Sequence, residues 1–264
     1  MSWDNDYRVL VAAMRDAGDT ALRAARDGFQ IHTKADQSPV TSADHAVNEI
    51  LQDRLLGAFP EDGWLSEESP DTNARLTRSR VWIIDPIDGT KAFIRREPEF
   101  CISVALIEDG RPVLAAIFNP STDELYTAQR GQGLRLNDKP RSTPVQSPAP
   151  HPIMALSPHE LRLGRFTSVE AHLAPRPMLS IAWAIALTAS GAIHGVMTFE
   201  PENEWDVAAG ALLIEEAGGV VRDVAGQPLR FNQSTPRYDG FLAMAAGFPD
   251  TLASQLFTLP RPAR

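Results

Sequence analysis

The sequence predicts a protein of the α+β class, with two helices and an antiparallel sheet in its N-terminal half and a mixed α/β arrangement in its C-terminal half. Three observations support this fold class. Apolar residues recur at helical spacing over residues 4–28 and again over residues 42–56. Short β-branched runs follow one another closely between residues 80 and 136. Beyond residue 152, strand-like and helix-like segments alternate.

The first half contains two predicted helices and several predicted strands. The first helix spans residues 4–28. The second begins near Ser42, which we expect to be its N-cap, because apolar residues then recur at helical spacing. The strands are separated by short turn signals, which favours antiparallel pairing. They cover residues 81–84, 100–107, 112–118 and 124–128.

The segment from Asn137 to Pro152 is rich in proline and serine and is the best candidate boundary in the chain. We therefore divide the chain into an N-terminal half, residues 1–140, and a C-terminal half, residues 141–264. The predicted strands of the second half cover 153–156, 194–199, 220–222 and 240–245, and its predicted helices cover 178–190 and 205–217.

Composition narrows the possible partners and the compartment. The chain is 43% hydrophobic and 22% charged, as is usual for a globular protein with a full core. Its net charge of −9 argues against nucleic-acid polymers and anionic membranes as partners. The single cysteine, Cys101, excludes an intrachain disulfide and lies in an apolar segment. No apolar run of membrane-spanning length and no signal-peptide pattern is present, so we expect a cytoplasmic location.

The strongest indication of function is the segment Trp82-Ile83-Ile84-Asp85-Pro86-Ile87-Asp88-Gly89-Thr90, in which an apolar run ends in two carboxylates followed by Gly-Thr. Pro86 has no N–H to donate, so we expect the strand to stop there and both aspartates to turn toward one point. Gly89 allows a ligand to approach the backbone closely. Carboxylate ligands suit Mg²⁺, which completes its coordination with water and substrate phosphate.

Two further acidic clusters are candidates for the same site. Glu67 and Glu68 follow a short apolar run, and Asp206 lies at the start of a helical segment, where the helix dipole favours an acid. Each motif alone also fits a role without a metal: a solvated turn for Glu67-Glu68, a helix-start acid for Asp206 and a common turn for Asp88-Gly89. The combination of all three clusters is what predicts a metal site.

Glu67-Glu68, Asp85-Pro86-Ile87-Asp88-Gly89-Thr90 and Trp205-Asp206-Val207-Ala208-Ala209-Gly210 together resemble the motifs of the inositol monophosphatase superfamily, over a region from Asp44 to Gly219. The resemblance implies a layered α-β-α-β-α sandwich. It also implies a Mg²⁺-dependent, lithium-sensitive phosphatase that acts on a small phosphorylated metabolite. Members are often homodimers, a state for which this sequence carries no independent signal.

By this resemblance, Mg²⁺ would be held by four carboxylates and one backbone carbonyl, those of Glu67, Asp85, Asp88, Asp206 and Ile87. Paired metal ions about 4 Å apart can activate water, neutralise the phosphoryl oxygens and assist the leaving alkoxide. A third, weaker Mg²⁺ would lie near Glu67.

The resemblance also assigns the catalytic groups. Thr90 and Asp44 would activate the attacking water, with Glu67 facing it. The N–H groups of Gly89 and Thr90 would bind the phosphate, as unpaired donors at a helix start can. Glu68 would orient the metal ligands from behind. No covalent phosphoenzyme is expected.

The residues after Thr90 give a weaker indication of the substrate. Lys91, Arg95 and Arg96 add positive charge, which suits a substrate with a second phosphate, although a solvated basic loop accounts for Arg95 and Arg96 nearly as well. Lys91 followed by X-Phe-Ile is similar to the bisphosphate nucleotidases. A 3′(2′),5′-bisphosphate nucleotidase is therefore favoured, with inositol-1-monophosphatase and histidinol-phosphate phosphatase as alternatives.

We expect the substrate pocket between two segments of the second half, with Ser180 and Trp183 on one side and Glu200 and Asn203 on the other. Trp183 would either pack in the core or stack on a substrate ring. The alternative to an enzyme is a regulatory protein that has the phosphatase fold, has lost catalytic activity and still binds a metal or a phosphate. It is disfavoured because none of the expected ligands has been replaced.

Overall fold

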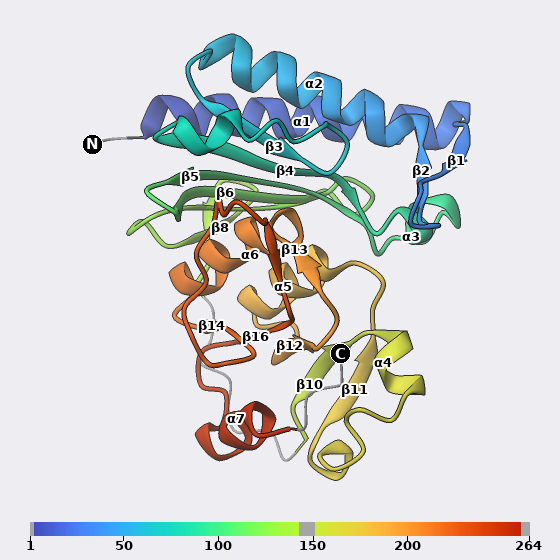
Figure 1. Cartoon of the computed structure of the whole chain (residues 1–264), viewed down its shortest axis with the longest axis vertical. Helices are drawn as coiled ribbons and strands as arrows, with labels where there is room; N and C mark the ends of the chain where they lie inside the picture. Colours follow the sequence, from blue (N-terminus) through green and yellow to red (C-terminus); the bar gives the residue numbers. More distant parts are fainter. Residues whose placement is uncertain (1–2, 143–150, 260–264) are drawn as a thin grey trace.

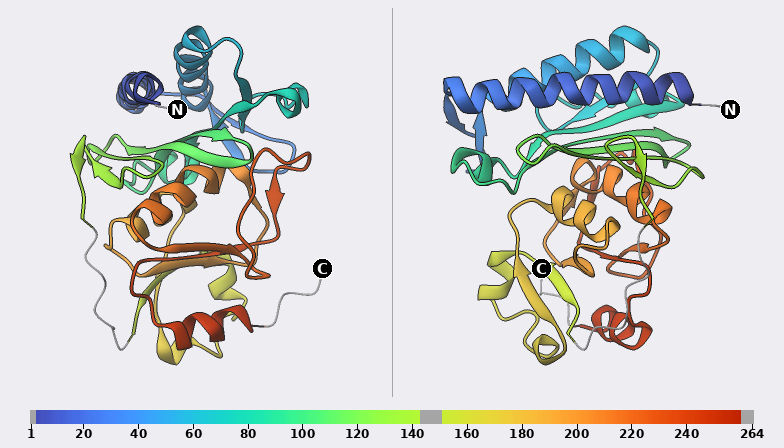
Figure 2. Two further views of the ribbon diagram at one scale, coloured as in Figure 1. Left: turned by 90° about the vertical axis from the view of Figure 1, so that its left-hand side faces the viewer. Right: turned by 180° about the vertical axis from the view of Figure 1, so that it is seen from behind.

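The computed structural model describes residues 3–142 and 151–259, which are arranged in five layers (Figures 1 and 2). Two long helices cover one face of a seven-stranded sheet. Two shorter helices separate that sheet from a five-stranded sheet, whose outer face is covered by the last helix. The layered α-β-α-β-α architecture is therefore confirmed.

The first layer consists of two helices joined by a β-hairpin, with bounds Asp4–Asp27 (α1), Ile31–Thr33 (β1), Pro39–Thr41 (β2) and Ser42–Ala58 (α2). Both helices bury apolar side chains such as Leu10 and Val47 against the sheet. The N-cap of α2 is Thr41 and not Ser42 as predicted. Thr41 and Asp44 form a capping box, in which each side chain accepts a hydrogen bond from the other residue's backbone N–H.

The seven-stranded sheet has the order β3-β4-β5-β6-β7-β8-β9. Its strands are Gly63–Ser66 (β3), Arg80–Asp88 (β4), Cys101–Glu108 (β5), Arg111–Asn119 (β6), Glu124–Gln129 (β7), Leu134–Leu136 (β8) and Lys139–Pro140 (β9). The antiparallel pairing predicted for this half is found from β4 to β9, whereas β3, which was not predicted, pairs parallel to β4.

Side chains of β4 alternate between the two faces of this sheet, as the strand geometry requires. Trp82 and Ile84 pack under α1 and α2, while Val81 and Ile83 join the core on the opposite face. Two short helices flank β4 in sequence, a 3₁₀ helix at Ala74–Thr77 (η1) and α3 at Thr90–Ile94.

The central layer consists of α5 (Ile181–Ala189) and α6 (Glu204–Glu216). Both are largely apolar on all sides, because they lie between two sheets and share one core with them. Gly210 allows the two helices to approach closely, since a Cβ at this position would lie 2.5 Å from the Cγ2 atom of Ile185. The helix predicted over 178–190 starts later, at Ile181, with Ser180 as its N-cap.

The five-stranded sheet has the order β11-β10-β12-β16-β14, and β10 pairs parallel with both of its neighbours. Its strands are Ile153–Leu156 (β10), Ala174–Pro177 (β11), Gly195–Thr198 (β12), Val220–Asp223 (β14) and Phe241–Met244 (β16). Short elements complete this half: α4 (Pro158–Arg162), η2 (Glu170–His172), β13 (Glu202–Asn203), β15 (Arg237–Tyr238) and α7 (Asp250–Phe257).

Each sheet is built from one of the two predicted halves, the first from strands ending at Pro140 and the second from strands beginning at Ile153. The predicted boundary segment, residues 137–152, lies partly outside the described residues, which resume at 151. Because α6 packs against strands of the first sheet, one core joins both halves. In the described part of the chain, no helix is both long and apolar enough to cross a membrane.

Candidate active site

The two aspartates of the central motif lie at the end of β4, on the side of the sheet that faces α6. Because side chains alternate along a strand, Asp85 shares the face of Val81 and Ile83. The strand does not stop at Pro86, as we predicted, but continues to Asp88. The pairing with β5 shifts between Asp85 and Asp88, so that three steps on β4 oppose two on β5. This bulge re-aims Asp88 toward the same site as Asp85.

Asp206 reaches the same point from the first turn of α6. Its Oδ2 accepts a hydrogen bond of 2.8 Å from the backbone N–H of Asn203, which holds the carboxylate at the helix start. One carboxylate oxygen from each of Asp85, Asp88 and Asp206 lies within 4.8 Å of the other two. The structure thus joins two of the three predicted acidic clusters in one group, which we call the acidic triad.

The acidic triad has the donor chemistry of a divalent cation site. Asp85 is 1% exposed, and its Oδ1 has no hydrogen-bond partner among the described residues. Such an oxygen is costly to bury unless a cation satisfies it. Burial, and then the charges of Glu67, Asp88 and Asp206, raise the pKa of Asp85 well above its usual range. Burial raises the pKa of Asp88 to about 6. An all-oxygen group of this kind fits Mg²⁺.

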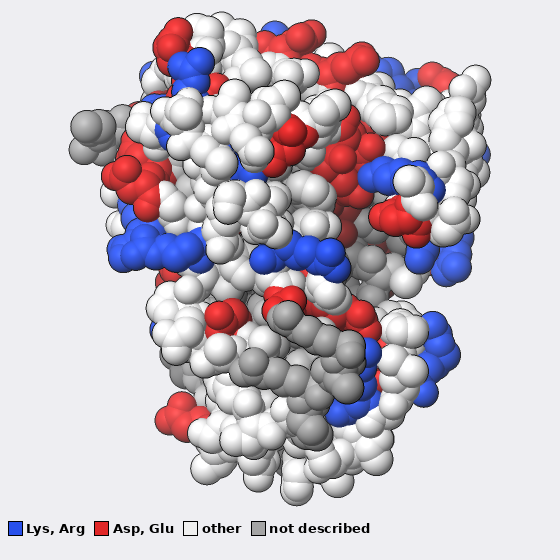
Figure 3. Space-filling model, viewed as in Figure 1, with Lys and Arg blue, Asp and Glu red and all other residues white. Residues whose placement is uncertain are grey.

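The third acidic cluster lies beside the triad and contacts a lysine that we did not anticipate. Lys34, in the turn between β1 and β2, donates from Nζ to Glu67 Oε1 at 2.6 Å and to Glu68 Oε1. Burial raises the pKa of Glu67, while Lys34 opposes this shift. On the face shown in Figure 3, acidic side chains run into a recess on the right of the upper half, with basic side chains beside them. Metal binding by Glu67 and the orienting role of Glu68 stay predictions.

Thr90 begins α3 directly after Gly89, whose φ is +89°. A Cβ at Gly89 would lie 2.9 Å from the carbonyl oxygen of Glu99, so both conformation and space require glycine. Thr90 Oγ1 lies 3.3 Å from Asp44 Oδ1 and 3.1 Å from the carbonyl oxygen of Ile87. The structure brings together the threonine and the carboxylate to which the resemblance assigned water activation. Phosphate binding by Gly89 and Thr90 stays a prediction.

Three of the four residues expected in the substrate pocket have other contacts. Ser180 Oγ donates to Asp88 Oδ2 at 2.7 Å, and so helps to fix this member of the triad. Trp183 is 4% exposed and packs against Tyr126, with ring centroids 5.8 Å apart, so it takes the core position of its two expected alternatives. Asn203 is the N-cap of α6 and positions Asp206.

A pocket of about 650 Å³ lies next to the acidic triad. It is lined by Glu200, the fourth of these residues, and by Lys91, which was predicted separately to favour a second phosphate. Several residues that line this pocket are neighbours in sequence of residues that contact the triad or lie close to it. Lys91 follows Thr90, and Ile181 lies between two residues that donate hydrogen bonds to Asp88. Glu202, also in the lining, precedes the N-cap residue that holds Asp206.

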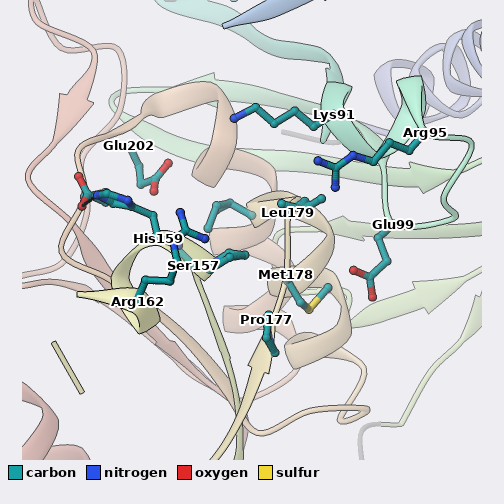
Figure 4. A pocket seen from close by; sticks show the side chains of 13 residues that line it. Lys91, Arg95, Glu99, Ser157, His159, Arg162, Pro177, Met178, Leu179 and Glu202 are labelled. Carbon is teal, nitrogen blue, oxygen red and sulfur yellow. Dashed lines mark hydrogen bonds and ion pairs between the residues drawn. The ribbon is translucent and has the colours of Figure 1, made fainter. Parts of the chain in front are cut away.

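Several lining residues were missed. Figure 4 shows Lys91 and Arg95 on one side of the pocket and His159 and Arg162, from α4, on the opposite side. Ser157 caps α4 through its hydroxyl, so Ser-Pro at 157–158 is a readable helix-start signal. Nothing in the local sequence indicates that this short helix faces α3, because the two are 60 or more residues apart and meet only in the tertiary fold.

Comparisons with known proteins agree with this site. A profile of the inositol monophosphatase family matches residues 2–253. The chain is 34% identical over 229 residues to the 3′(2′),5′-bisphosphate nucleotidase CysQ of Escherichia coli K12, covering 84% of this chain and 91% of the relative. It is 35% identical over 230 residues to the inositol-1-monophosphatase of Rhizobium meliloti, covering 83% and 85%. The crystal structure of the extragenic suppressor protein suhB from Bartonella henselae superposes with a TM-score of 0.82 at 29% identity, covering 95% and 96%.

The chain therefore belongs to the inositol monophosphatase family. It is an enzyme, a metal-dependent phosphoric monoester hydrolase that acts on a small phosphorylated compound. Family members depend on Mg²⁺ in general, and the acidic triad is a group that could bind it.

Proposed function

We propose that this phosphatase is a 3′(2′),5′-bisphosphate nucleotidase. Such an enzyme removes the 3′- or 2′-phosphate of a nucleotide and leaves its 5′-phosphate in place. The observation that carries the proposal is a set of uncompensated cations in the pocket. Lys91, Arg95 and Arg162 all line it, and none of the three makes an ion pair with a described residue. A substrate with one phosphate at the triad and another anionic group in the pocket would satisfy these charges.

The carboxylates of the pocket do not cancel this positive charge. Glu99 is paired with Arg176 at 2.9 Å, and Glu200 is paired with Arg165 at 2.5 Å. Burial raises the pKa of Glu202 to about 8, which favours the neutral form of this side chain. The pocket therefore presents three cations that form no ion pair with a described residue, although the protein as a whole has a net charge of −9.

The remaining wall of the pocket is apolar and suits a nucleobase. Pro177, Met178, Leu179 and Ile181 line the pocket, and Figure 4 shows the first three of them. Small-molecule pockets typically combine an apolar lining with a few placed polar groups, at volumes of about 300–1,000 Å³. A pocket of about 650 Å³ is within this range.

We assign the hydrolytic step to groups already in place. Asp85, Asp88 and Asp206 would hold Mg²⁺, and by the family resemblance Glu67 and the carbonyl of Ile87 would complete two or three sites. Bound Mg²⁺ supplies Lewis-acid stabilisation of the phosphoryl oxygens and a nucleophilic water at neutral pH. Thr90 Oγ1 orients the attacking water and passes its proton to Asp44. Burial raises the pKa of Asp44, which makes it a better base.

The same site supports inositol 1-phosphate as the second candidate substrate. Glu200 and Glu202 line the pocket, and carboxyl groups can hydrogen-bond the hydroxyls of a polyol. Histidinol phosphate is the third candidate. The test is to compare kcat/KM for adenosine 3′,5′-bisphosphate, inositol 1-phosphate and histidinol phosphate with Mg²⁺. We expect the bisphosphate to be preferred about a hundredfold, or roughly 2.7 kcal/mol of transition-state discrimination.

A pocket variant tests the reason for the preference. Arg162→Gln should raise KM for adenosine 3′,5′-bisphosphate about tenfold and change KM for inositol 1-phosphate little, because only the first substrate carries a second phosphate group. Arg162→Lys keeps the charge and should recover most of the affinity. Equal effects of Arg162→Gln on both substrates, or a preference of the wild type for inositol 1-phosphate, would overturn the substrate assignment.

A further inference from the structure

A second pocket, of about 490 Å³, lies at the opposite end of α6 from the acidic triad. Asp206 occupies the first turn of this helix, whereas Glu215, in its last turn, lines the second pocket. Arg111 and Arg130 contribute from the first sheet, and Arg222 and Arg230 contribute from the second half of the chain. The pocket therefore spans the two halves, away from the residues assigned to catalysis.

The charge of this second pocket is unusual for the protein. Four arginines and one glutamate line it, in a chain with a net charge of −9. Arg130 pairs with Glu215 at 3.3 Å and also donates to the carbonyl oxygen of Pro112. The Glu215 carboxylate and the negative end of the α6 dipole together neutralise about one of the four arginine charges.

The other three arginines are uncompensated. Among the described residues, Arg111, Arg222 and Arg230 form no ion pair, and the only hydrogen bond of the Arg222 guanidinium goes to the carbonyl oxygen of Val221, at 2.7 Å.

We propose that this pocket is a binding site for a phosphate-bearing anion with two or more negative charges, distinct from the substrate site. Guanidinium groups present paired N–H donors that match phosphate oxygens, and several converging on one concavity favour a multiply charged ligand. The volume is sufficient for a small phosphorylated metabolite.

The loop that forms one wall connects this site to the start of α6. Phe231 lines the pocket and donates its backbone N–H to the carbonyl oxygen of Gly110 at 3.1 Å. The next two residues, Asn232 and Gln233, donate their backbone N–H groups to the buried carboxylate of Glu204, at 2.6 and 2.9 Å. Glu204 is the first residue of α6. An anion in the pocket would therefore hold together the first sheet, this loop and both ends of the helix that carries Asp206.

The test is calorimetric titration of the full chain with pyrophosphate, in EDTA and at low salt, so that no turnover is involved. We expect saturable binding to the wild type. Arg222→Gln/Arg230→Gln should weaken it about tenfold or more, since the double variant removes two charge-assisted donors from the pocket. Arg8→Gln/Arg23→Gln removes two exposed charges from α1 and should leave binding unchanged.

Two further variants separate this site from the substrate pocket. Arg111→Gln, on the opposite wall, should weaken pyrophosphate binding as well, which guards against misfolding of the double variant as the cause. Lys91→Gln/Arg162→Gln should remove only the pyrophosphate bound in the substrate pocket and leave the binding that depends on Arg222 and Arg230. Absence of binding to the wild type, equal binding to wild type and Arg222→Gln/Arg230→Gln, or loss only in Lys91→Gln/Arg162→Gln would overturn the proposal. None of these outcomes depends on whether the substrate assignment is correct.

Discussion

Thr90 Oγ1 lies 3.3 Å from one carboxylate oxygen of Asp44, while the other oxygen of Asp44 accepts hydrogen bonds from the backbone N–H and the hydroxyl of Thr41. Asp44 therefore both caps α2 and contacts the threonine that follows the metal motif. A capping role and a catalytic role of this carboxylate are compatible, because its two oxygens serve different partners. The first helical layer is thereby tied directly to the active site.

Removing the hydroxyl of Thr90 should slow the chemical step more than it weakens substrate binding. We expect Thr90→Ala to lower kcat about a hundredfold with little change in KM, because the proposed role of the hydroxyl is proton transfer from water. Thr90→Ser keeps the hydroxyl and is the matched control. Steady-state phosphate release would check this, and a rise in KM alone would refute the assignment.

Replacing Asp88 by asparagine should remove most turnover without unfolding the protein. The substitution removes one of three mutually repelling carboxylates, and an amide oxygen can still accept from Ser180 Oγ and the backbone N–H of Ala182. We therefore expect the Tm of metal-free Asp88→Asn to equal or exceed that of the wild type. Asp53→Asn, on the exposed side of α2, should change neither activity nor Tm.

A large loss of Tm together with full activity in the folded fraction of Asp88→Asn would point instead to a structural carboxylate. Thermal melts in EDTA and phosphate-release assays with Mg²⁺, made on the same preparations, distinguish the two results.

Stability of the metal-free protein should fall as the pH rises. The pKa of Asp88 is raised by burial to about 6 in the folded state, so the folded state favours its protonated form. The stabilisation from this proton is complete below about pH 4, the unfolded-state pKa, and is lost as the pH rises through about 6. Asp85 and Asp206, whose pKa values burial also raises, act in the same direction.

Added Mg²⁺ should reverse this trend, because carboxylates bind a cation only when deprotonated. The increase in Tm on adding Mg²⁺ should be larger at about pH 7.5 than at about pH 5, where protons compete with the metal. Melting curves at the two pH values, with and without Mg²⁺, would check this. An Mg²⁺ effect that is independent of pH would place the cation away from the acidic triad.

Lithium at millimolar concentration should inhibit phosphate release, as the family resemblance implies for a small hard cation that replaces one Mg²⁺. Sodium or potassium chloride at the same concentration is the matched control for ionic strength. Full activity in lithium chloride would show that the metal sites of this enzyme differ from those of lithium-sensitive family members.

Much of the site was predictable because each of its acidic motifs is local. Asp85 and Asp88 end an apolar strand, and Asp206 starts an apolar helix, and both patterns can be read from neighbouring residues. Ser180 and Asn203 were predicted to contact the substrate, which stays a prediction, and the structure gives them contacts with the acidic triad that were not expected. They hold Asp88 and Asp206 in place, which cannot be read without knowing where the helix starts meet the end of β4.

The features that were missed depend on tertiary packing. Lys34 lies in a short turn with no sequence signal and meets Glu67 from 33 residues away. Arg162 faces Lys91 only because α4 of the second half lies across the pocket from α3 of the first. The strand was expected to end at Pro86 because proline cannot donate to the ladder, whereas the bulge between Asp85 and Asp88 accommodates it.

Identification of the products formed from adenosine 3′,5′-bisphosphate tests the central claim most directly. ³¹P NMR of the reaction with Mg²⁺ should show inorganic phosphate and adenosine 5′-phosphate in equal amounts, with no reaction in EDTA and none by Asp88→Asn. That result would show that hydrolysis depends on the metal and on the acidic triad, and that the substrate pocket accepts a nucleotide with two phosphates. Release of phosphate in EDTA, formation of adenosine 3′-phosphate, or no reaction at all would contradict the account.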